Sequence, residues 1–198
     1  MSEAEASAND GSSESTQAAQ DALAGAASTG AQVEVPELRT EYATTYANPD
    51  GISFTLEDSA VPVRVKGADG WRTPDATLEA RSDGSVGPKA AAVDLSFSGG
   101  GDGEDLVRIE RDGRSLGLGW PGELPEPKLD GNSALYSEVL PGVDLRLTAT
   151  VEGFREVLIV KSAQAAASEA LAEVSFALET AGLDVRETPA GRDAGGGR

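Results

Sequence analysis

The sequence predicts an all-β fold, an antiparallel β-sandwich with one short helix, preceded by a disordered N-terminal segment. Apolar and polar residues alternate over residues 52–56, 61–65, 93–97 and 174–178. A period of two is typical of strands that bury one face. Asp-Gly pairs, which favour hairpin turns because both residues tolerate positive φ, punctuate these stretches. They lie about 10 to 20 residues apart, at 50–51, 69–70, 83–84, 102–103, 112–113 and 130–131.

The composition divides the chain into three parts. Residues 1–32 are rich in Ala, Ser and acids, and Leu23 is their one large aliphatic residue. Burial cannot then offset the entropy of ordering them, so we expect a disordered acidic leader. The β-sandwich domain is expected over residues 33–188, and its short helix over the Ala-rich residues 163–172. Residues 189–198 have the composition of a Gly-rich tail or linker.

One hairpin can be predicted in detail over residues 143–161. Glu152-Gly153 supplies a two-residue turn, and the alternating apolar residues on both sides set the register. The opposite charges of Asp144 and Lys161 fall on facing positions, which supports this register. The predicted facing pairs are Val151 and Phe154, Leu147 and Leu158, Leu145 and Val160, and Asp144 and Lys161.

The same register places a charged residue, Glu156, opposite Ala149 on the apolar face of the hairpin. A charge on such a face is costly unless it is paired. Three interpretations are open: the carboxylate reaches water near the hairpin end, it has a structural partner on another strand, or it binds a ligand or metal. The candidate partners are Tyr136, Arg64 and Arg108.

The composition also narrows the function. Cysteine and histidine are absent, which excludes disulfides, thiolate metal sites and Ser–His or Cys–His catalysis within this chain. A net charge of -18 repels phosphates and anionic lipid, so neither nucleic acid nor membrane insertion is expected. Residues 102–105 are acidic but lack the ligand spacing of an EF-hand loop. We expect no enzyme activity, catalytic residue, cofactor or metal, although an acid pair of the glycosidase type is not excluded by counting carboxylates.

Two tryptophans are the candidates for ligand binding. Trp71 follows Gly70, and Trp120 precedes Pro121, so both stand at the edges of turns. Each ring could stack on a sugar, which would make the chain a carbohydrate-binding module. Each could instead cap one end of the core, where a tryptophan buries its ring and keeps its N–H in water.

An ordered series of short stretches resembles the N-terminal β-rich module of large secreted actinobacterial proteins with laminin-G-like jellyroll or RHS-repeat regions. The stretches are VEVPELRTE (33–41), TYANPDG (45–51), PVRV (62–65), GW (70–71), DATL (75–78), YSEVLPGVDL (136–145) and GFREVLIV (153–160). The resemblance covers residues 33–185.

The resemblance implies a non-catalytic accessory module of a larger secreted protein, of a structural or adhesion type, outside the cell or on its surface. Its implied partner is a glycan or a protein of the cell envelope. The first residues, MSEAE, do not resemble a signal peptide, which leaves a cytoplasmic location open.

Overall fold

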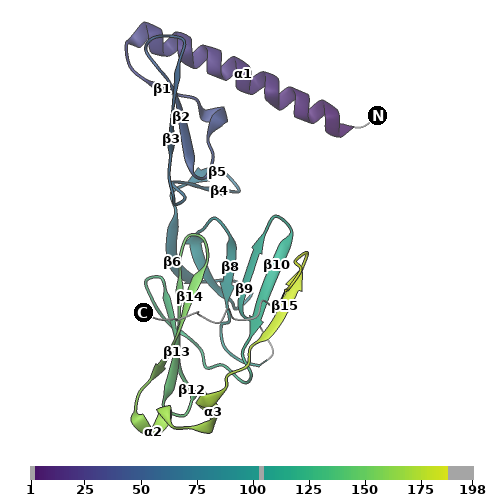
Figure 1. Cartoon of the computed structure of the whole chain (residues 1–198), viewed down its shortest axis with the longest axis vertical. Coiled ribbons are helices and arrows are strands. Elements are labelled where there is room, and N and C mark those ends of the chain that lie inside the picture. The colour runs from purple at the N-terminus through teal and green to yellow at the C-terminus, as the bar shows by residue number, and fades with distance from the viewer. Residues whose placement is uncertain (1–2, 103–104, 187–198) are drawn as a thin grey trace, which may run out of the picture. The chain divides into compact units, whose positions relative to one another are not determined.

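The structure is a computed structural model that describes residues 3–102 and 105–186, and for residues 3–14 the backbone alone. Its contacts divide the chain into two compact units (Figure 1). The first contains the residues up to Ala76 together with Lys89–Ala92, and the second contains Thr77–Pro88 and the residues from Val93 onward. This division differs from the single domain that the sequence predicts over residues 33–188.

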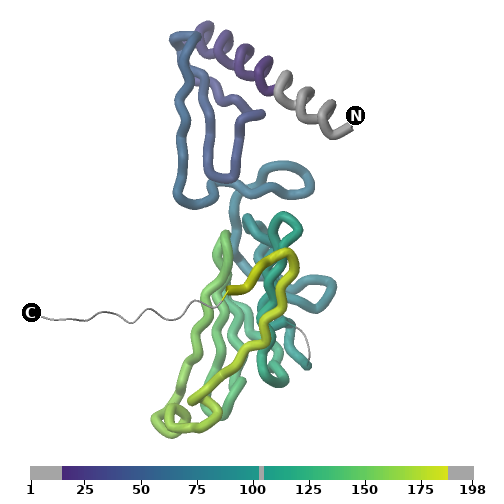
Figure 2. The backbone as a smooth tube through the Cα atoms, turned by 45° about the vertical axis from the view of Figure 1, so that its right-hand side comes forward, coloured from purple at the N-terminus to yellow at the C-terminus, as the bar shows by residue number. Residues whose placement is uncertain are grey.

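The first unit combines a long helix with a small antiparallel sheet, and the chain can be followed through both in Figure 2. A three-stranded sheet has the order β1-β2-β3, and β4 pairs with β5 as a separate hairpin. The elements are α1 (Glu3–Thr29), β1 (Val33–Glu34), η1 (Pro36–Leu38), β2 (Ala43–Ala47), β3 (Phe54–Asp58), β4 (Val65–Gly67) and β5 (Gly70–Arg72).

Helix α1 contradicts the prediction of a disordered leader over residues 1–32. Ala22 and Ala26 of this helix are buried against Val35 and Ala47 of the sheet region. Alanine is the best helix former, and its small side chain lets the helix come close to the sheet. The prediction was wrong because it asked for large aliphatic residues, whereas small ones are enough for this contact.

The second unit contains two antiparallel sheets, and only the start of β6 (75–76) and the end of β7 (89–90) group with the first unit. One has six strands in the order β15-β10-β9-β8-β7-β6, and the other has four in the order β11-β12-β13-β14. The strands are β6 (Asp75–Ala80), β7 (Val86–Ala90), β8 (Asp94–Phe97), β9 (Asp105–Arg111), β10 (Arg114–Gly119), β11 (Lys128–Asp130), β12 (Ser133–Leu140), β13 (Val143–Ala149), β14 (Phe154–Val160) and β15 (Ala177–Ala181).

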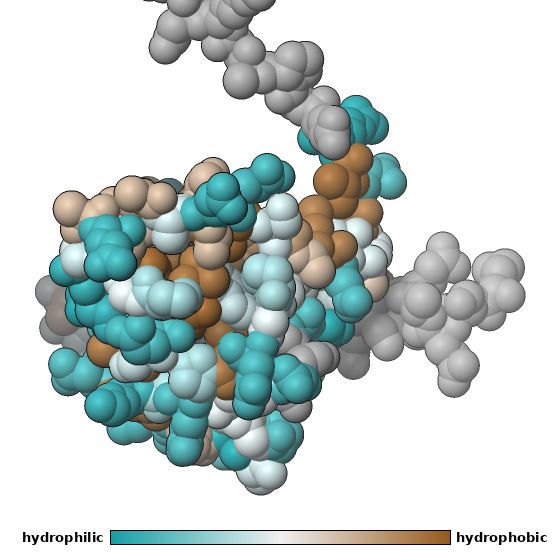
Figure 3. All heavy atoms as spheres, turned by 90° about the horizontal axis from the view of Figure 1, so that it is seen from below, coloured by the Kyte–Doolittle hydropathy of each residue, from teal (hydrophilic) through white to brown (hydrophobic). Residues whose placement is uncertain are grey.

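A shared apolar core confirms the predicted all-β sandwich. Inward residues of both sheets form one buried cluster, and hydrophilic residues cover much of the outside (Figure 3). Tyr136 of β12 is fully buried, and its hydroxyl donates a hydrogen bond of 2.6 Å to the carbonyl of Ser98. The largest members include Leu95 and Phe97 of β8, Leu106 and Val107 of β9, and Leu145 and Leu147 of β13.

The Asp-Gly pairs make turns, as predicted. Asp112 and Gly113, which join β9 to β10, have φ values of 52° and 70°. Positive φ at both positions is the geometry of a type I′ hairpin turn. The pairs at 50–51, 69–70, 83–84 and 130–131 likewise lie at connections between strands that pair with each other, where Gly70 begins β5 and Asp130 ends β11. The pair at 102–103 extends outside the described residues.

The β13–β14 hairpin exists, but its register differs from the predicted one by two residues. Ala149 pairs with Phe154, and Leu147 pairs with Glu156. The connection is longer than predicted because Thr150 donates a backbone hydrogen bond of 2.8 Å to Gly153, which closes a four-residue loop. A shift by two keeps every side chain on its predicted face.

The predicted helix over residues 163–172 is present as two short helices, α2 (Ala163–Ala166) and α3 (Glu169–Ala172). Ser162 caps α2, because its hydroxyl accepts a hydrogen bond of 3.1 Å from the backbone N–H of Ala165. The break falls between two pieces of alanine-rich chain that are each too short to be stable alone. The predicted tail at residues 189–198 lies outside the described part of the chain.

We predict that Leu147→Ala lowers the free energy of unfolding by about 2–5 kcal/mol, because the side chain is fully buried and its loss leaves a cavity. Denaturant unfolding at neutral pH measures the change. Val157→Ala on the outer face of β14, where Val157 is 53% exposed, is the control and should cost less than about 1 kcal/mol. Equal losses in the two variants would contradict the sandwich described above.

Candidate functional site

Trp71, the first candidate, lies on β5 of the first unit and is 37% exposed. The guanidinium carbon of Arg64 lies 6.0 Å from the ring centroid, within the range of a cation–π contact. Trp71 therefore keeps a partly exposed ring beside a cation, an arrangement that can receive the face of a sugar.

Arg64 also stabilises the first unit through hydrogen bonds of its guanidinium. Its guanidinium donates hydrogen bonds to the carbonyls of Thr40 (3.0 Å) and Ala43 (2.8 Å), and to the hydroxyl of Thr44 (2.6 Å). Glu34 lies 3.8 Å away. The planar fork of an arginine can reach acceptors in several directions at once, which a lysine cannot. Arg64 thus connects the approach to β4 with the start of β2.

Glu34 is engaged mainly by another arginine. Arg39 donates two hydrogen bonds to its carboxylate, at 2.6 and 2.7 Å. The hydrogen bond from Arg39 lowers the pKa of Glu34 below its ordinary value, and partial burial opposes this effect. Arg39 and Glu34 therefore have a structural role, because each neutralises the charge of the other.

Trp120, the second candidate, is half-buried in the other unit. It packs edge-to-face against Phe176, with ring centroids 5.6 Å apart and an interplanar angle of 68°. Both rings border the sandwich core. The structure therefore assigns Trp120 to packing, and it places the two tryptophans in different units.

Glu156 lies on the inward face of β14, as the sequence predicts, and the structure shows it half-buried. Burial raises its pKa above the ordinary value. The predicted structural partners were wrong, because Tyr136 bonds to Ser98, Arg108 to Asp105 and Arg64 to the first unit. Glu156 makes no hydrogen bond or ion pair with any residue that the structure describes.

A charged cluster that the sequence predicts only in part lies at one end of the four-stranded sheet. Lys161 contacts Asp144 at 2.7 Å and also pairs with Glu138. The ion pair between Asp144 and Lys161 was thus predicted, although these residues are diagonal neighbours rather than facing ones. Hydrogen bonds from Lys161 lower the pKa of both carboxyls.

Glu138 was missed because a β-bulge brings it into this cluster. The register of β12 against β13 shifts between Tyr136 and Leu140, and Glu138 has a φ of 57°. Its carboxylate accepts a hydrogen bond of 2.8 Å from the N–H of Gly142. The bonds to Gly142 and Lys161 stabilise a backbone conformation that a non-glycine residue seldom adopts. The carboxylate of Glu138 therefore has a structural role.

A polar pocket of about 240 Å³ opens beside β8 and β9. Asp83 and Asp105 both line it. Asp83 accepts bonds from the hydroxyl and N–H of Ser85, and Asp105 pairs with Arg108 at 3.2 Å. Among the residues the structure describes, no three acidic, histidine or cysteine side chains lie close enough to hold a metal.

A second, more apolar groove of about 470 Å³ lies in the first unit, between α1 and β3. The alternation of residues 52–56 predicted a half-buried strand here, yet Phe54 and Leu56 are 43% and 64% exposed. The lining residues are Ser15, Thr16, Ala19, Gln20, Leu23, Leu38 and Phe54. The sequence gives no signal for this groove, because α1 forms one wall and was not expected.

We predict that Arg64→Lys destabilises the first unit by about 1–3 kcal/mol, because one ammonium cannot replace hydrogen bonds to three acceptors. Unfolding of a Trp120→Phe background leaves Trp71 to report on the first unit by fluorescence. Arg72→Lys, at an exposed position of β5, is the control. An unchanged midpoint in Arg64→Lys would show that these bonds contribute nothing.

A second prediction concerns the pH dependence of Glu156. Its pKa is raised in the folded state, which means that the fold favours the protonated carboxyl. The stability that comes from this protonation is complete below the unfolded pKa and is lost as pH rises through the folded pKa. Glu156→Gln should therefore melt at a higher temperature than the natural chain at pH 7, and the gap should close towards pH 4. Glu179→Gln, an equal charge change on exposed β15, is the control. A gap that stays constant between the two pH values would contradict this assignment.

The comparisons with known proteins add no relative. No family model, no curated protein and no solved structure matches the chain. None of the helices in the described part of the chain is both long and apolar enough to span a membrane. The resemblance to secreted modules stays a prediction, and the function has to be argued from the surfaces of the two units.

Proposed function

We propose that the protein is a non-catalytic, adhesion-type accessory module of a larger secreted protein, and that it acts at the cell surface by binding an extended segment of a partner protein. The observation that carries this proposal is the open edge of β3. The sheet order β1-β2-β3 leaves this strand with a neighbour on one side alone within the first unit.

The hydrogen bonds around β3 identify which backbone groups are free. Asn48 donates to the carbonyl of Ser53 at 2.9 Å, and Ser59 donates to Tyr42 at 2.9 Å. Hydrogen-bonded positions alternate along an antiparallel pair, so Thr55 also bonds to β2. The N–H and C=O groups of Phe54 and Leu56 consequently point away from β2, where a further strand can bond to them.

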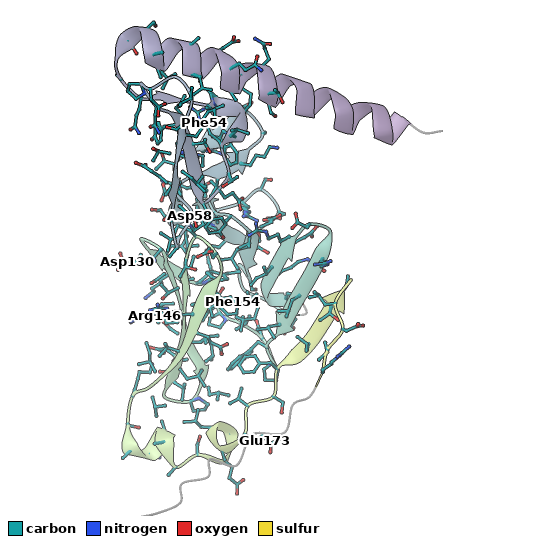
Figure 4. All side chains as sticks on the ribbon, turned by 45° about the horizontal axis from the view of Figure 1, so that its top comes forward. Phe54, Asp58, Asp130, Arg146, Phe154 and Glu173 are labelled. Atoms are coloured by element: carbon teal, nitrogen blue, oxygen red, sulfur yellow. The ribbon has the colours of Figure 1, made fainter. Side chains whose placement is uncertain are left out.

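The side chains beside this edge favour an apolar partner segment. Phe54 lies at one end of β3 and Asp58 at the other (Figure 4). Phe54 borders the groove that also contains Leu23 and Leu38. When a strand is added to a sheet, main-chain hydrogen bonds supply affinity and pockets for alternate side chains supply specificity. An aliphatic side chain of the added segment would fill the groove.

The charged groups support a non-catalytic role. The first unit is stabilised by hydrogen bonds and ion pairs of Arg64, Glu34 and Arg39. The bulge of β12 is stabilised by those of Glu138, Asp144 and Lys161. A catalytic carboxylate needs access to a substrate proton. Each of these carboxylates already accepts structural hydrogen bonds.

The second candidate function is carbohydrate binding by Trp71. It is favoured by one observation, the 37% exposure of a ring that has the guanidinium of Arg64 beside it. Aromatic rings with one apolar and one wet side suit such contacts. This function would leave the edge of β3 without a role in binding.

We predict that the purified chain binds to cell envelopes of the producing organism and that Leu56→Pro weakens this binding about tenfold, the equivalent of one lost hydrogen bond. Proline removes the outward N–H of Leu56, which β2 does not use, so the melting temperature should change little. Leu56→Val keeps the N–H and is the matched control. Cosedimentation with the envelopes measures binding.

Two treatments separate the alternatives. Protease treatment of the envelopes should abolish binding if the partner is a protein. Binding that survives the protease and is lost in Trp71→Ala would replace the proposal with carbohydrate binding. Undiminished binding by Leu56→Pro, or no binding to envelopes at all, would refute the role of the β3 edge.

A further inference from the structure

The outer face of the four-stranded sheet in the second unit carries a group of cations. The register aligns Lys128, Leu135, Arg146 and Val157 in one row across the four strands. The next row ends in Arg155, which pairs with Thr148. Figure 4 shows Asp130 and Arg146 on one side of this sheet and Phe154 on the side of the core.

Three cations of this face form no ion pair with any described residue. Lys128, Arg146 and Arg155 are exposed, and none forms an ion pair with the part of the chain that the structure describes. Lys161, at one end of the same face, is neutralised by Glu138 and Asp144. On the outer face of these strands Asp130 is the remaining carboxylate, at the far end of the row that contains Arg155.

This arrangement is unusual in a chain with 34 acidic and 16 basic residues. A random distribution would place carboxylates beside most of the cations. The field of three unpaired cations on a low-dielectric sheet attracts anions locally, although the whole molecule is acidic. The sheet does not need these cations for folding, because they lie opposite the core.

The spacing of the cations defines the ligand. Lys128 and Arg146 are two strands apart, about 10 Å at the usual strand separation. Arg146 and Arg155 are diagonal neighbours on adjacent strands, about 7–8 Å apart. Exposed Val157, 53% accessible, lies beside both arginines and offers an apolar surface.

We propose that this face binds an acidic polysaccharide, a linear chain that carries one carboxylate or phosphate group about every 5–10 Å. The anionic groups contact Lys128, Arg146 and Arg155, and the apolar face of a sugar ring rests on Val157. Nucleic acid is the poorer match, because it carries a charge on every nucleotide, and the charges that extend beyond the three cations would meet the acidic remainder of the surface. This site is independent of the β3 edge, which belongs to the first unit.

The test uses the full chain and four probes: polygalacturonate for carboxylates, poly(glycerol phosphate) for phosphates, dextran as an uncharged glycan, and a single-stranded oligonucleotide. Affinity electrophoresis at low and at physiological salt measures binding. We expect binding to one or both anionic polymers, a weaker complex at the higher salt concentration, and no binding to dextran. Which of the two polymers binds more tightly identifies the anionic group.

The deciding variant is Arg146→Glu combined with Arg155→Glu, which should weaken binding about tenfold or more. Lys66→Glu combined with Arg72→Glu makes the same charge change at exposed positions of the first unit and should have less than about a twofold effect. Both double variants are checked for an unchanged melting temperature. If arginine reversal alters the fold, Arg146→Gln combined with Arg155→Gln replaces it.

Four results would overturn the proposal. They are an equal loss of binding in the two double variants, tighter binding of the oligonucleotide than of either anionic polymer, binding of dextran at the same strength, and absence of binding to both anionic polymers at low salt.

Discussion

The second unit depends on burying the inward faces of two sheets in one core, and Tyr136 shows the constraint most clearly. Its ring is among the largest side chains that are fully buried, and its hydroxyl can be taken from water because the Ser98 carbonyl accepts its hydrogen bond. That bond joins β12 of one sheet to the end of β8 in the other. Because one face of each strand is buried in the core, the charged residues of β13 and β14 that face solvent lie on the opposite face.

The sequence predicts which face each residue occupies better than it predicts the partner. Alternation correctly places Leu147 and Glu156 towards the core, because a register error of two residues preserves the face. The loop length was the error, since Thr150 and Gly153 close a longer turn that no Asp-Gly signal marks. Helix α1 was missed because alanine contacts carry no hydrophobic pattern, and the groove beside β3 was missed with it.

The candidate surfaces were less predictable, for a related reason. Net charge is a property of the whole chain, whereas the cations of the outer face gather through the register in which successive strands pair. Lys128 and Arg146 stand 18 positions apart in the printed sequence and come into line only when β11, β12 and β13 are in register. The tryptophans are conspicuous in the sequence, yet Trp120 serves packing and Trp71 alone keeps an exposed ring.

The inward carboxylate of Glu156 also affects whether copies of the molecule can associate through their strand edges. β14 is an edge strand, and an edge with apolar side chains is a template for aggregation. A second molecule that extended the sheet past β14 would enclose Glu156 between two cores and bury its charge completely. On the edge strand β3, the face that contains Phe54 and Leu56 has no charged residue before Asp58. The molecule thus has one edge whose inward charge opposes self-assembly and another edge without such a charge beside its apolar residues.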